Sequence, residues 1–210
     1  MSRDNILHRV RTAIGRSAGQ EPEEPPPVLL KVPEVDLERR IATFSAALDK
    51  LSGEAHVVGS VEEGRRVVES LVEGRSAVAS NSSYLRECGI ASLAGVFTGY
   101  TDADELREAC AISDVGITSA DYVLADTGSL VMLASPEEAR LVSLLPPAHI
   151  AIVPRQRILT CLDELFTILP DPATQTSSMV VITGTSRTAD IEQILIKGVH
   201  GPGKLHAVIV

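Results

Sequence analysis

The chain has 210 residues, of which 44% are hydrophobic and 22% charged, and its formal net charge is −9. These proportions are ordinary for a globular protein with a substantial core. The acidic balance argues against a nucleic-acid partner, because such partners need a concentrated positive surface. No apolar run approaches the ~18 residues of a membrane span, and the first residues lack the apolar stretch of a secretory signal. A cytoplasmic protein is therefore expected.

The three cysteines, Cys88, Cys110 and Cys161, are widely spaced and form no Cys-x-x-Cys pair. Neither a zinc ribbon nor a cysteine-ligated iron–sulfur cluster is expected from this chain, and the sparse count is typical of a reducing compartment. The five histidines show no metal-ligand spacing. We therefore expect no metal site and no cofactor.

Three parts are predicted along the chain. Residues 4–16 place Ile6, Val10 and Ile14 on one face of a helix. The segment that follows is rich in proline and glutamate, and proline fixes φ and lacks the amide donor, so it reads as an extended linker. The expected division is an amphipathic helical arm (1–19), a Pro/Glu-rich linker (20–35) and a single α/β domain (36–210).

Helical and extended patterns alternate in the remainder of the chain. Capping boxes mark helix starts at Ser60, with Glu63, and at Thr101, with Asp104. Helices are expected at 37–51, from 60 onward, and at 101–110, 137–145, 159–169 and 189–197. Strands are expected at 55–59, 76–80, 95–98, 122–125, 130–134, 149–153, 178–182 and 205–210. Because the strands are aliphatic without polar alternation, this order predicts one mostly parallel sheet with helices on both faces.

The two strands at 122–125 and 130–134 flank Asp-Thr-Gly-Ser, which predicts a hairpin. The same four letters resemble the catalytic loop of aspartic proteases. That chemistry needs two aspartates sharing a proton, whereas this chain has one copy among many helices. A tight turn is the better interpretation, with Gly128 at positive φ and Asp126 or Ser129 bonded to the turn.

A second polar loop follows the strand at 178–182. A glycine between a strand and a helix start is a natural anion site, because free amides and the helix dipole point into the loop. Ser186, Arg187 and Thr188 add hydroxyl and guanidinium donors for a carboxylate or phosphate. Two alternatives stay open: Thr188 simply caps the helix with Asp190 near its start, or Arg187 pairs with an internal carboxylate such as Asp126.

We expect these two loops to meet around one small anionic ligand, with Thr127 or Ser129 within about 10 Å of Ser186 or Arg187. His200, between glycines, is either an acid–base group or a turn residue. No catalytic residue is identified, and whether the chain is an enzyme is left open. The candidate ligand-binding residues are Asp126, Thr127, Ser129, Thr185, Ser186, Arg187, Thr188, Asp190 and His200.

Taken together, several segments resemble the LUD-domain family over most of residues 36–210. The most specific are Ser-Arg-Thr-Ala-Asp-Ile-Glu at 186–192 and Gly-Val-His-Gly-Pro at 198–202, supported by the segments 125–129, 139–140 and 143–150. One departure is Thr185, where family members usually have proline, which affects the rigidity of the loop.

The resemblance implies a three-layer α/β/α domain of the NagB/RpiA/CoA-transferase-like class. It also implies a role in oxidising L-lactate to pyruvate together with iron–sulfur partner proteins. The alternative is a stand-alone small-molecule isomerase or transferase of the same class. CoA transferases of the related fold use a glutamate nucleophile, and no glutamate in this sequence stands in a context that marks it as that residue.

Overall fold

The computed structural model describes residues 2–17, 19–20, 30–189 and 195–210, with only the backbone described at 188–189 and 195–197. Its helices are α1 (Arg3–Ala13), α2 (Leu37–Lys50), α3 (Val61–Val72), α4 (Ser83–Glu87), α5 (Ala103–Ile112), α6 (Leu141–Leu144) and α7 (Leu162–Ile168). Its strands are β1 (Glu54–Val57), β2 (Ala77–Ala79), β3 (Val96–Phe97), β4 (Val115–Ser119), β5 (Tyr122–Leu124), β6 (Ser129–Leu133), β7 (Ala148–Val153), β8 (Ile158–Leu159), β9 (Met179–Ile182), β10 (Arg187–Ala189), β11 (Leu195–Lys197) and β12 (Lys204–Ile209).

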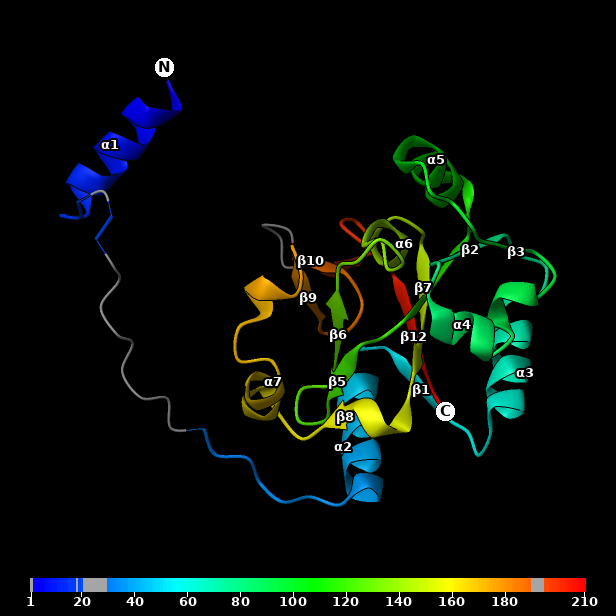
Figure 1. Cartoon of the computed structure of the whole chain (residues 1–210). Coiled ribbons are helices and arrows are strands. Elements are labelled where there is room, and N and C mark those ends of the chain that lie inside the picture. The colour runs from blue at the N-terminus through cyan, green and yellow to red at the C-terminus, as the bar shows by residue number, and fades with distance from the viewer. Residues whose placement is uncertain (1, 18, 21–29, 190–194) are drawn as a thin grey trace.

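The centre of the molecule is a six-stranded sheet in the order β1-β12-β7-β4-β2-β3, and every pair in it is parallel. All six residues of β7 are buried, as expected for a parallel strand covered on both faces. The last described strand, β12, lies inside this sheet between β1 and β7 (Figure 1). The predicted α/β class with a mostly parallel sheet is confirmed.

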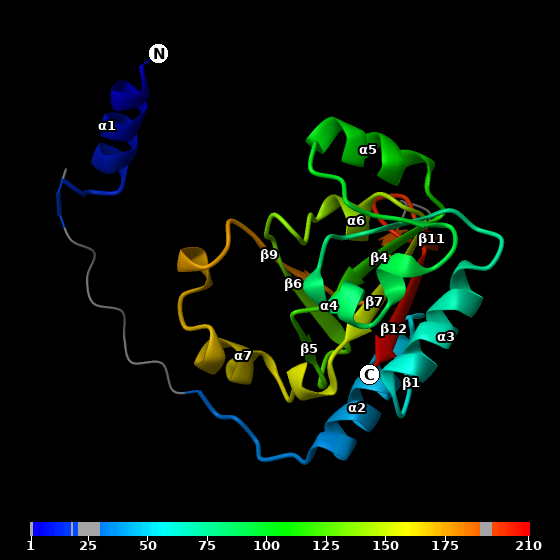
Figure 2. The same cartoon turned by 45° about the vertical axis from the view of Figure 1, so that its right-hand side comes forward.

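A second sheet, in the order β8-β5-β6-β9, was not expected. It covers part of one face of the central sheet, where residues of β5 and β6 share a buried cluster with β7 and β12. Helices α3 and α4 cover the opposite face, and α7 packs on the outer face of the second sheet. Figures 1 and 2 both show α3 on the far side of the central sheet from β5, β6 and α7.

Helix α2 contacts both sheets through Ile41, Phe44 and Leu48, which are buried in the same cluster. Two tight turns of the second sheet also pack against the C-terminal end of α2. Gly128 and Gly184 have positive φ. A side-chain carbon at Gly128 would collide with the backbone of α2, and one at Gly184 would collide with Leu51. Glycine is required at both turns for conformation and for space, and the two predicted loops consequently lie against one helix end.

The prediction of a helix at 189–197 is wrong for residues 189 and 195–197, which the structure describes. Arg187–Ala189 and Leu195–Lys197 are strands β10 and β11, paired antiparallel with Thr188 opposite Ile196. Residues 190–194 lie outside the described residues. The helical spacing of apolar residues is weak evidence for a helix in a segment that contains β-branched residues, because these residues favour strands.

Other differences are smaller. Strand β4 was not predicted, although it lies between β7 and β2 in the sheet. Helix α5 is capped by Asp102, whose carboxylate accepts from the amides of Asp104 and Glu105, rather than by Thr101. Helix α6 covers only part of the expected 137–145. The capping of α3 by Ser60 and the hairpin of β5 and β6 are confirmed.

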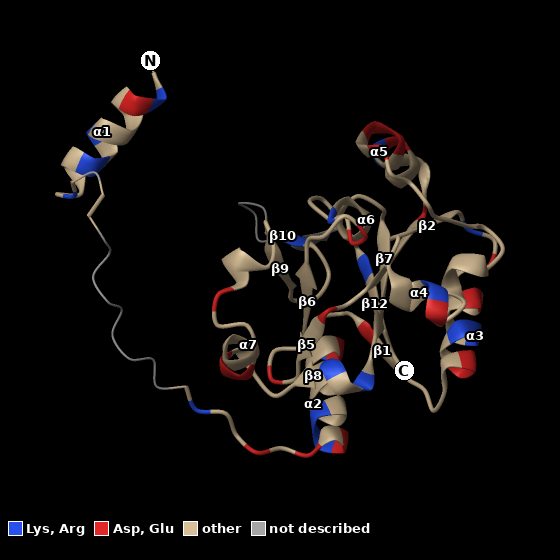
Figure 3. Cartoon of the chain, in the orientation of Figure 1, with Lys and Arg blue, Asp and Glu red and all other residues tan. Residues whose placement is uncertain are grey.

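Helix α1 has no buried residue, and Ile6, Val10 and Ile14 are exposed by 49%, 50% and 59%. Its remaining surface carries several arginines (Figure 3). The apolar stripe predicts that these three side chains pack, either on the chain's own domain or on a neighbouring subunit. They do not pack on the domain in the described structure, and the division into arm, linker and domain stays a prediction. Within the described part of the chain, no helix combines the length and the apolar character needed to cross a bilayer.

Candidate functional site

The chain reverses its winding direction between two neighbouring strands of the central sheet. The loop after β2 leads to α4 on one face, whereas the loop after β4 leads to β5 and the second sheet on the other face. In α/β sheets such a switch point opens a crevice outside the carboxyl ends of the strands, and ligands bind there. The residues that follow β2 and β4 are therefore candidates for a ligand-binding site.

Polar side chains from three segments meet at this crevice. Glu138 Oε1 accepts from the backbone amide of Ser119 at 3.0 Å and from its hydroxyl at 2.5 Å. The Ser119 hydroxyl also lies 2.8 Å from that of Ser82, the N-cap of α4. Asn81 joins the neighbouring loop, because its Nδ2 donates to the carbonyl of Tyr100 at 2.7 Å. These contacts hold the carboxyl group of Glu138 at the end of β4.

Glu138 is a buried carboxyl group whose second oxygen is unpartnered. Its Oε2 has no hydrogen-bond partner in the described structure, and neither has the buried hydroxyl of Ser80 at the end of β2. Burial raises the pKa of Glu138, while the hydrogen bonds from Ser119 and the proximity of the Ser80 hydroxyl act in the opposite direction. Unsatisfied buried polar atoms and a carboxyl with raised pKa are both features that gather at functional sites.

A cavity of about 210 Å³ opens beside this cluster. Ser80 and Asn81 line it from the loop after β2, and Ser135 and Glu137 from the loop after β6. The first turn of α5, which carries Asp104 and Glu105, is an acidic surface near the same opening (Figure 3). The cavity is therefore lined by hydroxyl groups, including that of Ser80, and its rim is negatively charged. Glu138, whose pKa is raised, stands in the chain between the lining residues Glu137 and Ala139.

The first predicted loop lies on the second sheet. Ser129 donates its hydroxyl to Thr127 at 2.8 Å, and its Oγ lies 2.9 Å from that of Thr183 at the end of β9. Strands β6 and β9 are antiparallel neighbours, with Leu130 opposite Ile182. The two predicted loops thus begin side by side. The hydroxyl of Ser129, however, contacts those of Thr127 and Thr183.

The second predicted loop runs along the end of α2. Arg187 donates to the hydroxyl of Ser52 at 2.9 Å, and Ser52 has a φ of +63°, uncommon for a residue with a side chain. Thr185 donates to the carbonyl of Leu51 at 3.4 Å, and the amide of His200 donates to Ser186 Oγ at 3.3 Å. No ion pair of Arg187 with a carboxylate is found among the described residues.

Two further predicted positions carry no side-chain description. The side chain of Thr188 and the whole of Asp190 lie outside the described residues. Arg187–Ala189 is a strand, so no helix dipole at these residues favours an anion. Of the predicted anion-binding features, the guanidinium group of Arg187 is the one that still applies.

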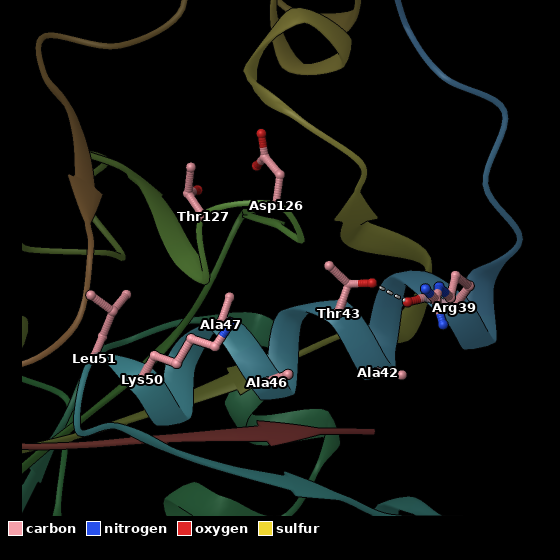
Figure 4. Close-up of a pocket in the computed structure, with 9 residues that line it drawn as sticks. All are labelled: Arg39, Ala42, Thr43, Ala46, Ala47, Lys50, Leu51, Asp126 and Thr127. Carbon is pink, nitrogen blue, oxygen red and sulfur yellow. Dashed lines mark hydrogen bonds between the residues drawn. The ribbon is translucent and has the colours of Figure 1, made fainter.

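Asp126 and Thr127 line a different hollow, shown in Figure 4. It has a volume of about 460 Å³ and lies between their turn and α2, whose Arg39 and Lys50 line the opposite wall. Three alanines, Ala42, Ala46 and Ala47, form its floor. The hollow is broad and open, and the carboxylate of Asp126, the only acidic group among its lining residues, points away from α2 (Figure 4).

Sequence reasoning missed Glu138, Ser80 and Ser119. Each stands in an ordinary local context, and their meeting depends on β4, which was not predicted. The one local signal was Gly116 within β4, because an interior strand glycine marks a close backbone approach. A side-chain carbon there would collide with the carbonyl of Val142 in α6.

Comparison with known proteins agrees with this architecture. The family model described as the LUD domain matches residues 41–210. A protein named lactate utilization protein C from Halalkalibacterium halodurans is 36% identical over 53% of this chain and 50% of its own length. One of the same name from Exiguobacterium sp. is 39% identical over 50% of this chain and 47% of its own. The chain thus spans about half the length of these two relatives.

A third lactate utilization protein C, from Oceanobacillus iheyensis, is 27% identical and is matched over 100% of this chain and 98% of its own length. The crystal structure of a DUF162 family protein from Deinococcus radiodurans superposes with a TM-score of 0.63 at 16% identity. It covers 84% of this chain and 99% of that one, and shows the same fold.

Fold and crevice together define an α/β protein with a parallel central sheet and a polar cluster at its switch point. With the family match over residues 41–210, the chain belongs to the LUD domain family.

Proposed function

We propose that the chain is a component of a lactate-utilisation system, acting with iron–sulfur partner proteins that oxidise L-lactate to pyruvate. We further propose that it binds a small hydroxy- or keto-acid in the crevice between β2 and β4. The relatives named lactate utilization protein C support the first part, above all the one matched along the whole chain. The geometry of the crevice supports the second.

The observation that carries the ligand proposal is the pair of unsatisfied buried atoms, Glu138 Oε2 and Ser80 Oγ. A carboxyl with raised pKa keeps its proton more readily, and a protonated carboxyl donates a hydrogen bond to a ligand carboxylate without repelling it. A hydroxyl or keto oxygen of the same ligand would find a donor in Ser80. A small acid would therefore give both atoms the partners they lack.

The test is calorimetric titration of the isolated chain with L-lactate and pyruvate, comparing wild type with Ser80→Ala and Glu138→Ala. Loss of one hydrogen bond to a charged ligand should weaken binding about tenfold. Arg187→Ala is the matched control, because Arg187 lies on the other candidate loop. Weakening by Arg187→Ala alone would move the site to the loop of Thr185, Ser186 and His200, and no saturable binding would contradict the ligand proposal.

The role in lactate utilisation is tested separately, by deleting the gene in the organism that carries it. Growth on L-lactate should fail while growth on pyruvate continues, and unchanged growth on both would contradict the role. In vitro, lactate oxidation by the iron–sulfur partners should require this chain.

A stand-alone isomerase or transferase is the second candidate. It is favoured by one feature, a carboxyl of raised pKa with two neighbouring serine hydroxyls, since a carboxyl that keeps its proton more readily can act as a general acid or base. Turnover of a small acid by the isolated chain, lost in Glu138→Gln, would support this candidate over a role as a subunit.

A further inference from the structure

We propose that Glu54, His56 and His206 form a binding site for a divalent first-row transition-metal ion, of which zinc fits best. Glu54 and His56 are two positions apart on β1, so their side chains leave the same face of the strand. Strand β12 is the parallel neighbour of β1, with His206 opposite Glu54. All three groups therefore project from the face that α3 covers, where Val58 and Val208 also lie.

The distances match those around a metal ion. His56 Nε2 and His206 Nδ1 are 3.3 Å apart, and His206 Nδ1 and Glu54 Oε2 are 3.5 Å apart. Two ligand atoms on a tetrahedral zinc, with bonds of about 2.0–2.1 Å, are separated by about 3.3 Å. One potential ligand atom from each residue lies within 4.8 Å of the other two. Glu54 is exposed, so its carboxylate is free to approach the two ring nitrogens more closely.

The two histidines are also suited to bind a metal ion, because imidazole nitrogen is the commonest protein ligand of such ions. The two imidazole rings stack at 5.5 Å between centroids, so the strands already hold both nitrogens side by side. Two imidazoles and a carboxylate are a ligand set that suits zinc and neighbouring transition metals.

The surroundings leave one coordination position available. A cavity of about 470 Å³ adjoins Glu54 and His206 and is lined on its other side by Arg75 and Lys204. Three protein ligands with one open position are typical of zinc sites that take water or a small anion. The two cations reduce the attraction for the metal itself, and they favour an anion, such as a small carboxylate, as the fourth ligand.

The site is separate from the crevice of Glu138. It lies at the amino ends of β1 and β12, whereas the crevice is at the carboxyl ends of β2 and β4. The buried His149 of β7 is not part of it, because His149 projects from the opposite face of the sheet. The metal proposal therefore does not depend on the proposed function.

The experiment uses the full chain without a histidine tag, stripped with chelator and titrated calorimetrically with Zn²⁺, and separately with Co²⁺ as a spectroscopic probe. We expect one ion per chain and the strong visible absorption of four-coordinate Co²⁺. Glu54→Gln and His56→Gln lie on the edge strand β1, where Glu54 is exposed and His56 is half-buried, and both variants should fold normally. Each should weaken binding by more than the roughly 10–100-fold that changes around metal ligands produce.

The matched control is His8→Gln on the exposed α1, which should bind Zn²⁺ like wild type. Equal Zn²⁺ affinity in all variants would overturn the proposal, as would no binding by the wild-type chain. Weakening in His8→Gln alone would assign the ion to the arm instead.

Discussion

The hydroxyl oxygen of Thr118 lies 2.8 Å from Nε2 of His149, and both side chains are buried between β4 and β7. Nδ1 of His149 has no partner among the described residues. Burial lowers the pKa of His149 to about 4, with the proximity of His206 adding to the effect. The imidazole is therefore neutral in the folded protein at pH 7.

This histidine predicts a loss of stability in mild acid. Its folded-state pKa lies below the ordinary 6.5, so its stabilising contribution is present above pH 6.5 and is lost as pH falls toward 4. The loss should reach about 3 kcal/mol, measured by denaturant unfolding across that range. In His149→Gln the dependence on pH should be smaller, whereas His8→Gln should keep the wild-type dependence. An unchanged slope in His149→Gln would contradict the assignment.

Glu138 predicts the opposite dependence on pH. Its folded-state pKa is raised above the ordinary 4.5, so protonation stabilises the fold at low pH and this contribution is lost as pH rises. Glu138→Gln mimics the protonated carboxyl and does not titrate. Its free energy of unfolding, relative to wild type, should increase as pH rises above the ordinary 4.5. A constant difference would mean that the carboxyl of Glu138 has an ordinary pKa.

Gly116 predicts a steric effect in the middle of the central sheet. A methyl group there would collide with the carbonyl of Val142, which is backbone and cannot rotate away. Gly116→Ala should lower the free energy of unfolding by about 1–3 kcal/mol or more. Gly59→Ala is the control, because an added methyl there meets only the Glu63 side chain at an ordinary 3.5 Å. Equal stability of the two variants would show that β4 and α6 separate easily.

The arm predicts a separable segment. Because α1 buries none of its residues, deletion of residues 1–33 should leave the thermal midpoint of the remaining domain nearly unchanged. If the exposed Ile6, Val10 and Ile14 dock on a second copy or a partner protein, the deletion should reduce association measured by sedimentation. Unfolding of the truncated chain would show instead that the arm belongs to the core.

The predictable part of the fold is the part whose residues carry their own local signals. Strand β7 is a continuous aliphatic run, Ser60 with Glu63 marks the start of α3, and Gly128 marks the hairpin of β5 and β6. These features depend on nearest neighbours in sequence. They place the parallel sheet and the Asp126 turn without knowledge of tertiary contacts.

The remaining features depend on contacts between distant segments. Strand β4 contains a glycine, which weakens its signal as a strand, and this glycine lies against α6. Strands β10 and β11 form because they pair with each other. Glu138 acquires its environment from Ser80 and Ser119 only after β2 and β4 align, and His206 lies 150 positions from His56. Contacts between residues so far apart in the chain cannot be predicted from local sequence patterns.

The two glycine turns that press on α2 have a mechanical consequence. Gly128 lies against the backbone of Ala47 and Leu48, and Gly184 lies against Leu51, within little more than one helical turn. A shift of α2 along its axis would break one contact or overlap the other. The two turns therefore fix the position of α2 along its axis, and with it the contact of α2 with β1 of the central sheet.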